Sequence, residues 1–145
     1  MATMTRSQAR EVVFCLLFET EFHKDRSPEE IYALSAEVRE FCEVSGANAS
    51  YIRRVYFGVC ERLSELDEII ARHSNGWRTD RIAPVSRSIL RLATYEILFE
   101  EDVPSAVAMN EAVELTKKFD VEKARGFVNG ILNSVKNELD AAKAE

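Results

Sequence analysis

The sequence predicts an all-α protein, and three observations favour this fold class. The 145 residues include only five glycines and three prolines, so few positions interrupt a helix. Apolar residues recur at spacings of three and four along most of the chain, as they do on one face of a helix. No stretch of convincing length alternates apolar and polar residues as a half-buried strand does. We expect one domain over residues 1–145, a compact bundle of about six or seven helices.

Capping signals predict where the first two helices begin. Thr5 followed by Gln8 has the spacing of a capping box, and the helix that it opens should run to about Phe22. In residues 27–30 the serine can cap, the proline suits the first helical position and the second glutamate completes another box. This second helix should end where residues 45–48, with their Ser-Gly pair, interrupt the apolar pattern.

Four further helices are expected in the rest of the chain. A long helix over about residues 49–73 should end before Gly76, since glycine often follows a helix C-terminus. Pro84 suits the first position of the next helix, which a break at 102–105 should end. The last two helices are expected to end near residue 119 and to span about 121–142. Trp77, in the connection, is expected to pack back against the bundle.

The sequence lacks the motifs of catalysis, so we expect no enzyme. Neither His23 nor His73 has a second histidine or a cysteine at metal-ligand spacing. The five glycines form neither a dinucleotide-binding motif nor a P-loop, and no nucleophile is paired with a base. We therefore expect no cofactor and no metal site. The pattern Gly126-x-x-x-Gly130 in the last helix is more typical of close helix packing than of ligand binding.

The cysteines and the hydropathy indicate the compartment. Cys15, Cys42 and Cys60 are far apart and odd in number, which is typical of reduced thiols in a cytosolic protein. No N-terminal segment resembles a signal peptide, and no apolar run approaches the ~18–20 residues that span a bilayer. We expect a cytoplasmic protein that does not enter a membrane.

Charge is unevenly distributed along the chain. The net charge is −6 and the pI is about 5.1, which counts mildly against a general nucleic-acid binder. Arginine dominates residues 72–91, whereas every charged residue in 96–114 is acidic. A nucleic-acid site would therefore have to be a local basic patch.

One local grouping suits single-stranded RNA. Lys123 and Arg125 lie beside Phe127, and such sites combine cations that neutralise phosphates with an aromatic ring that stacks on a base. The alternative is that these charges belong to a solvated helix start and that Phe127 belongs to the core. The residues alone leave both interpretations open.

Three stretches together resemble a known family. The first is SILRLATYEIL at 88–98, continued by DVP at 102–104 and NEAVEL at 110–115. The second is FVNGIL at 127–132, and the third is Ala-Arg-Glu at 9–11 followed by an apolar helix. In this order and spacing they resemble the NusB transcription antitermination family. The resemblance covers roughly residues 5–138 and is weakest at 24–50.

The resemblance implies a fold and a function. NusB-like proteins are all-α, with two packed helical subdomains. They bind the boxA segment of nascent RNA together with NusE, a ribosomal protein, and the pair joins an antitermination complex on RNA polymerase, notably in ribosomal RNA operons. They catalyse no reaction. Monomers and homodimers both fit the resemblance.

The resemblance also implies which residues bind each partner. RNA would contact Arg6, Arg10, Lys123, Arg125 and Phe127. NusE would face Phe18, Arg91, Tyr95 and Glu96, although Phe18 and Tyr95 also suit a core. The asparagines Asn110 and Asn129 are expected to bond across helices inside the fold.

The chain departs from the family pattern at its N-terminus. Many NusB-like proteins begin with a dense arginine cluster, whereas here Arg6 alone precedes Arg10. This keeps open a protein-interaction helical module with little RNA binding. A further alternative is a stand-alone relative of the NusB-like domain of a ribosomal RNA cytosine methyltransferase.

Overall fold

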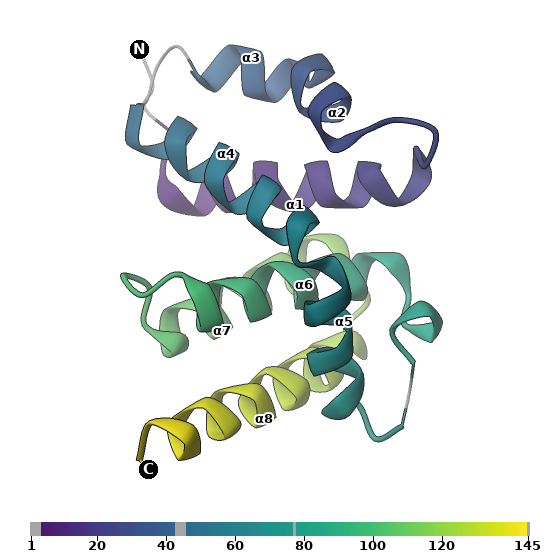
Figure 1. Cartoon of the computed structure of the whole chain (residues 1–145), viewed down its shortest axis with the longest axis vertical. Helices are drawn as coiled ribbons and strands as arrows, with labels where there is room; N and C mark the ends of the chain where they lie inside the picture. The colour runs from purple at the N-terminus through teal and green to yellow at the C-terminus, as the bar shows by residue number, and fades with distance from the viewer. Residues whose placement is uncertain (1–3, 43–45, 77, 145) are drawn as a thin grey trace. The chain divides into compact units, whose positions relative to one another are not determined.

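The computed structural model describes residues 4–42, 46–76 and 78–144. Within these ranges the chain forms eight α-helices and one short 3-10 helix, with no strand (Figure 1). The prediction of an all-α fold is confirmed. The contacts divide the chain into two compact units, Met1–Glu61 and Arg62–Glu145, called unit 1 and unit 2 below.

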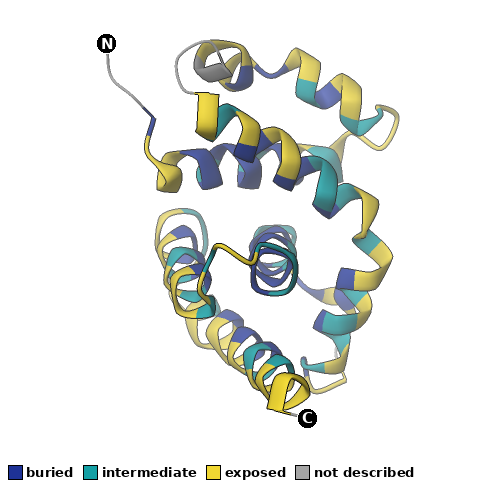
Figure 2. Cartoon of the chain, turned by 60° about the vertical axis from the view of Figure 1, so that its left-hand side comes forward, coloured by how far each residue is buried: buried dark blue, intermediate teal, exposed yellow. Residues whose placement is uncertain are grey.

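Unit 1 contains four helices, α1 (Arg6–Phe22), α2 (Pro28–Leu34), α3 (Ala36–Cys42) and α4 (Gly46–Glu61). Helix α1 packs against α4 and α2, and α3 also packs against α4. The faces of α1 and α4 that meet are buried and apolar (Figure 2). Tyr51, Ile52 and Val55 on α4 are fully buried. Burial of this apolar surface is the main force that stabilises the unit.

The two predicted capping boxes are confirmed. The Thr5 hydroxyl accepts a hydrogen bond from the Gln8 backbone N–H at 3.1 Å, and the Thr5 N–H donates to Gln8 Oε1 at 2.8 Å. The Ser27 hydroxyl and the Glu30 carboxylate make the same reciprocal pair at the start of α2. Because each box satisfies two otherwise unpaired N–H groups, it sets where its helix begins.

The structure divides two of the predicted helices. Ser35 has extended backbone angles (φ −69°, ψ 121°), and its hydroxyl accepts from the Val38 N–H at 3.2 Å, so it separates α2 from α3. Arg62 (φ −111°, ψ 21°) separates α4 from α5 (Leu63–Arg72) within the predicted helix 49–73. The apolar stripe continues across Arg62, but α4 packs on α1 and α3 whereas α5 packs on α6 and α8.

Unit 2 consists of α5, the 3-10 helix η1 (Thr79–Arg81), α6 (Pro84–Phe99), α7 (Ser105–Phe119) and α8 (Ala124–Ala144). Helix α6 is the core element, since it packs against α5, α7 and α8. Asn75 and Gly76 adopt left-handed backbone angles (φ 52° and 84°) just after α5, as predicted for its end. The prediction for Trp77 lies outside the described residues.

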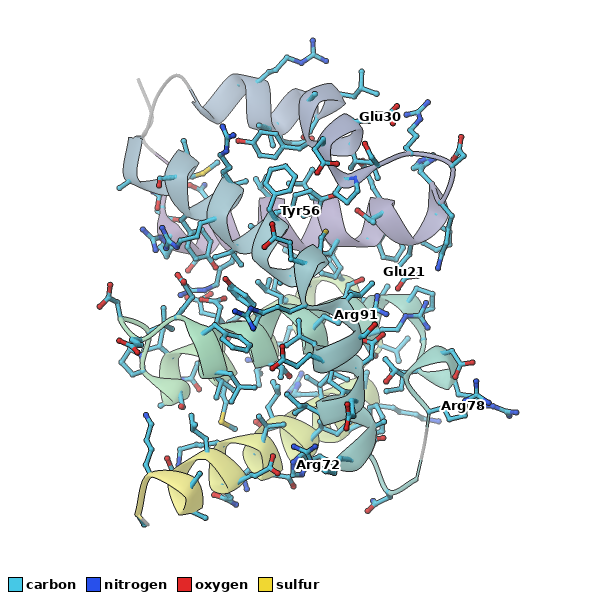
Figure 3. All side chains as sticks on the ribbon, in the orientation of Figure 1. Glu21, Glu30, Tyr56, Arg72, Arg78 and Arg91 are labelled. Carbon is cyan, nitrogen blue, oxygen red and sulfur yellow. The ribbon has the colours of Figure 1, made fainter. Side chains whose placement is uncertain are left out.

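Two charged contacts tie α5 to its neighbours (Figure 3). The Arg91 guanidinium of α6 donates two hydrogen bonds to the Asp67 carboxylate, both at 2.8 Å. Arg72 and His73, at the end of α5, both contact the Glu138 carboxylate of α8 at 2.9 Å. The guanidinium of Arg72 and the His73 ring lower the pKa of Glu138 from its ordinary value.

Two structural expectations for α7 and α8 are wrong. Gly126 and Gly130 are exposed, and a Cβ at either would meet no neighbour within 4 Å, so they mediate no close helix packing. Asn110 and Asn129 are exposed rather than buried between helices. Helix α8 buries only its apolar side, and Gly126, Asn129 and Gly130 lie on its opposite side. Asn110 lies on the outer side of α7.

None of the described helices has both the length and the apolar composition to cross a membrane.

Candidate nucleic-acid interface

In unit 1, Arg6 is held in place by helix α4. Its Nε donates to Asn48 Oδ1 at 2.8 Å, and the Asn48 amide donates in turn to the Met4 carbonyl at 2.6 Å. The Arg6 guanidinium also lies over the Tyr51 ring, 4.3 Å from its centroid. A guanidinium fixed by stacking loses less freedom when it binds an anion, because its orientation is already restricted.

Two more arginines gather around the same ring. The guanidinium of Arg10 lies 5.7 Å from the Tyr51 centroid, and that of Arg54 lies 6.0 Å from it. We call Arg6, Arg10 and Arg54 the Tyr51 arginine cluster. Arg6 and Arg54 are exposed, whereas Arg10 is only 4% exposed. The two exposed members are therefore the ones that a ligand in solution can reach.

Sequence reasoning missed Arg54. It is far from Arg6 along the chain, and only the packing of α1 on α4 brings the two side chains to one ring. One signal was available: Arg53 and Arg54 are the only charged residues between positions 46 and 60. The N-terminal arginine cluster that looked sparse in the sequence thus gains a third member from α4.

In unit 2, Phe127 borders a groove of about 330 Å³. Val121 and Ile82 add apolar surface to the groove, and Lys123 and Arg81 add positive charge. Phe127 is 37% exposed, which excludes the alternative that its ring belongs to the core. Arg125 is also exposed but does not line the groove.

The groove holds one carboxylate, which is engaged within the protein. Asp120 accepts a hydrogen bond from the Ser86 hydroxyl at 2.5 Å and another from the Val121 N–H at 2.8 Å. Both hydrogen bonds join the Asp120 carboxylate to other groups of the protein. The remaining charged side chains of the groove, Lys123 and Arg81, give it a net positive character.

The residues predicted to face NusE lie in both units. Phe18 belongs to a row of rings on α1, 6.1 Å from Phe14 and 4.8 Å from Phe22. Phe22 is 58% exposed, so the row reaches the surface at one end. The other three residues, on α6, are Arg91 with its Asp67 pair, Tyr95 and Glu96.

These three residues of α6 expose little side-chain surface. The Arg91 side chain is 11% exposed, and Tyr95 and Glu96 are 7% and 1% exposed. Their burial gives each a structural part in unit 2. A role in contacting a partner stays a prediction.

No metal site is found among the described residues, where no three His, Cys, Asp or Glu side chains gather in a position to hold an ion. The features that stand out are instead arginines around a tyrosine ring and an exposed phenylalanine beside a basic groove. Cations with nearby aromatic rings are typical of small proteins that bind single-stranded nucleic acid.

The comparisons with known proteins show the family. The model of the NusB family matches residues 7–137, and the chain belongs to this family. One relative is the transcription antitermination protein NusB of Enterococcus faecalis, 41% identical over 143 residues, covering 95% of this chain and 93% of the relative. Another, from Agathobacter rectalis, bears the same name and is 43% identical over 130 residues, with 89% and 97% of the two chains covered.

Solved structures agree with this assignment. NusB of T. maritima is 36% identical, covers 94% of both chains and superimposes with a TM-score of 0.84. A chain from the complex of antitermination factors NusB and NusE with double-stranded RNA is 26% identical, with a TM-score of 0.81. That match covers 93% of this chain and 99% of the other.

Proposed function

We propose that this protein is a transcription antitermination factor that binds boxA RNA together with NusE. The observation that carries the proposal is the match, over 93% of the chain, to a structure of NusB and NusE with RNA. The names of the relatives support the same function. The complex would join RNA polymerase in the cytoplasm, notably on ribosomal RNA operons, and the protein would act without catalysis or a cofactor.

The Tyr51 arginine cluster would bind RNA phosphates in unit 1. Arg6 and Arg54 are exposed residues, and Arg6 is already oriented by Asn48 and the Tyr51 ring. Arg10 is buried, so its charge would act on the strand mainly by adding to the local positive potential. These contacts would raise the affinity for RNA without distinguishing one sequence from another, since every nucleotide has a phosphate.

The Phe127 groove would bind a base in unit 2. The exposed ring can stack on an unpaired base, and Lys123 and Arg125 can neutralise the phosphates on either side. Stacking of this kind favours single strands over duplexes, because a base inside a duplex is not available to the ring.

NusE would be bound by residues of both units, Phe18 in unit 1 and Arg91, Tyr95 and Glu96 in unit 2. The half-buried Phe18, beside the exposed Phe22, can offer apolar surface directly. Tyr95 and Glu96 would act mainly by keeping α6 in the shape that a partner contacts, because their side chains are buried.

A binding titration tests the proposal. A short boxA-type RNA and a scrambled RNA are titrated with the protein at several salt concentrations, with and without purified NusE. We expect boxA binding that is tighter than scrambled binding, strengthens with NusE and weakens as salt rises, because phosphate contacts release counterions. If NusE binds but boxA is not preferred, the protein is an interaction module. If neither NusE nor boxA RNA binds, the protein shares the fold of the family but not its function.

A further inference from the structure

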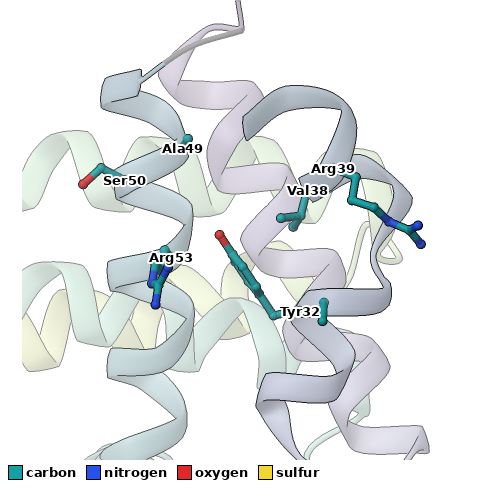
Figure 4. Close-up of a pocket in the computed structure, with 7 residues that line it drawn as sticks. Tyr32, Val38, Arg39, Ala49, Ser50 and Arg53 are labelled. Carbon is teal, nitrogen blue, oxygen red and sulfur yellow. The ribbon is translucent and has the colours of Figure 1, made fainter. Parts of the chain in front are cut away.

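A second basic groove lies in unit 1, between α4 and the pair α2–α3 (Figure 4). Its volume is about 490 Å³, within the range of roughly 300–1,000 Å³ that small-molecule sites occupy. Tyr32 and Val38 line one wall, and Ser50 and Arg53 line the wall formed by α4. None of these residues belongs to the Tyr51 arginine cluster or to the Phe127 groove.

The charge of this groove is positive. Among its described lining residues the charged side chains are Arg53 and Arg39, and both are exposed. Arg39 donates one hydrogen bond to the Leu34 carbonyl at 3.2 Å, which uses one of its five N–H groups. Figure 4 shows its guanidinium at the outer edge, whereas Arg53 projects from the α4 wall. Ser50, one turn before Arg53 on α4, also lines the groove, although its hydroxyl points away from Tyr32 in Figure 4.

The opposite wall is aromatic and held rigidly. The Tyr32 ring packs 5.2 Å from Phe57 and 6.4 Å from Tyr56, and the Tyr56 hydroxyl is bonded to Thr20 at 2.7 Å. In Figure 4 the Tyr32 ring extends into the groove between α3 and α4. A fixed ring opposite a cation offers an apolar surface for a sugar or base whose phosphate meets the arginine.

Helix α4 joins this groove to the Tyr51 arginine cluster. Arg53 and Arg54 are consecutive, so their side chains leave the helix about 100° apart and less than 2 Å apart along its axis. Arg54 faces the Tyr51 ring and Arg53 lines the groove. The groove and the Tyr51 arginine cluster therefore meet at two neighbouring residues of α4.

We propose that this groove is an additional site for single-stranded RNA, with a backbone phosphate bound by Arg53 and a sugar or base against Tyr32. Charge complementarity, the aromatic wall and the continuity with Arg54 all favour a nucleic-acid strand as the occupant. The inference rests on the proposed function, because it extends the path of the same RNA.

The test compares charge reversals at two exposed arginines of unit 1. Arg53→Glu replaces one of the two groove cations, the one on α4, with a carboxylate. Arg26→Glu makes the same charge change in the turn before α2, outside the groove lining and the Tyr51 arginine cluster. The loss of one phosphate contact should lower the slope of log K against log salt by about 0.7 and weaken RNA binding about fivefold at 0.1 M salt. The Arg26 variant should keep the wild-type slope. Arg53→Lys, which keeps the positive charge, should also keep the wild-type slope.

A second readout locates the strand without relying on affinity. In nuclear magnetic resonance titrations, boxA RNA should shift the backbone amide signals of Val38 and Ser50 in the wild type. These shifts should disappear in Arg53→Glu, whose thermal unfolding should match that of the wild type because Arg53 is exposed.

The outcomes separate the two proposals. Equal slopes and affinities for the Arg53→Glu and Arg26→Glu variants, with wild-type binding intact, would overturn the groove and leave the RNA-binding function standing. Wild-type protein that fails to prefer boxA over scrambled RNA would overturn the function, and with it the groove. Signals of Val38 and Ser50 that do not move on RNA binding would also overturn the groove.

Discussion

Tyr51 shows how one buried residue can organise a charged surface. Its ring is fully buried between α1 and α4, yet three guanidinium groups lie around it. An aromatic face attracts cations, which offsets part of the repulsion among the arginines. The residue therefore links the packing of unit 1 to the positive charge on its surface.

Phe127 carries the first prediction at the residue scale. Phe127→Ala should weaken binding of boxA RNA by about 1–3 kcal/mol, because a stacking ring is lost. Its partial exposure means that the melting temperature should change little. Val121→Ala removes an exposed apolar side chain from the same groove without removing a ring, and it should leave RNA affinity nearly unchanged. Equal losses in the two variants would show that Phe127 does not stack on RNA.

The second prediction concerns Arg91 and its partner Asp67. Comparing variants of the two residues distinguishes an effect on stability from an effect on partner binding. Arg91→Ala and Asp67→Ala each break the same bidentate pair, so each should destabilise unit 2 by about 1–3 kcal/mol in chemical denaturation. If Arg91 also faces NusE, only the Arg91 variant should bind NusE more weakly at a temperature where both are folded. Equal NusE affinity in the two variants would show that Arg91 stabilises unit 2 but does not contact NusE.

At the scale of elements, helix starts position functional side chains. Thr5 caps α1, and the residue that follows it is Arg6. Ser27 caps α2 with the same reciprocal bonds, but its first turn carries none of the residues proposed to bind RNA. The two caps therefore form a natural comparison between helix stability and RNA binding.

Thr5→Ala and Ser27→Ala should each lower the free energy of unfolding by roughly 1 kcal/mol, as loss of a cap commonly does. Thr5→Ala should also weaken RNA binding, because a frayed first turn releases Arg6 from Asn48 and the Tyr51 ring. Ser27→Ala should leave RNA affinity at the wild-type value. Stability is measured by urea unfolding and affinity by titration. A Thr5 variant with full RNA affinity would mean that Arg6 needs no positioning.

The contact between α5 and α8 predicts a pH dependence. Because Arg72 and His73 lower the pKa of Glu138, its ionised form is favoured in the folded state. The stability it adds is present above the ordinary glutamate pKa of about 4.3 and is lost as pH falls through the lower folded value. Glu138→Gln should therefore lower the melting temperature slightly at pH 7 and converge with the wild type in acid. Glu114→Gln, at an exposed helix pair, should show a smaller difference.

At the scale of the whole molecule, net charge and local charge differ in sign. The chain is acidic overall, with a net charge of −6, yet all three proposed RNA surfaces are basic. Net negative charge repels nucleic acid at long range, whereas local arginines act within about 10 Å at 0.1 M salt. This arrangement suits a protein that binds RNA at defined positions rather than along any strand.

The sequence by itself determined the local structure and the family. Capping boxes at Thr5 and Ser27, the glycine after α5 and Pro84 at the start of α6 are signals between near neighbours in the chain, so they could be interpreted without a fold. The order and spacing of the three motifs were also sufficient to identify the NusB family, which the comparisons confirm.

Only the tertiary structure decided which distant residues meet and which side chains stay exposed. The break at Arg62 depends on α4 and α5 packing against different helices, although their apolar stripe is continuous. Arg54 joins Arg6 because α4 packs on α1. Gly126 and Gly130 are open because, beyond the adjoining residues of α8, no atom of the described residues lies within 4 Å of the place where a Cβ would stand. Helical periodicity records that a face is apolar or polar, but not which element covers it, because that choice depends on contacts between segments far apart in the chain.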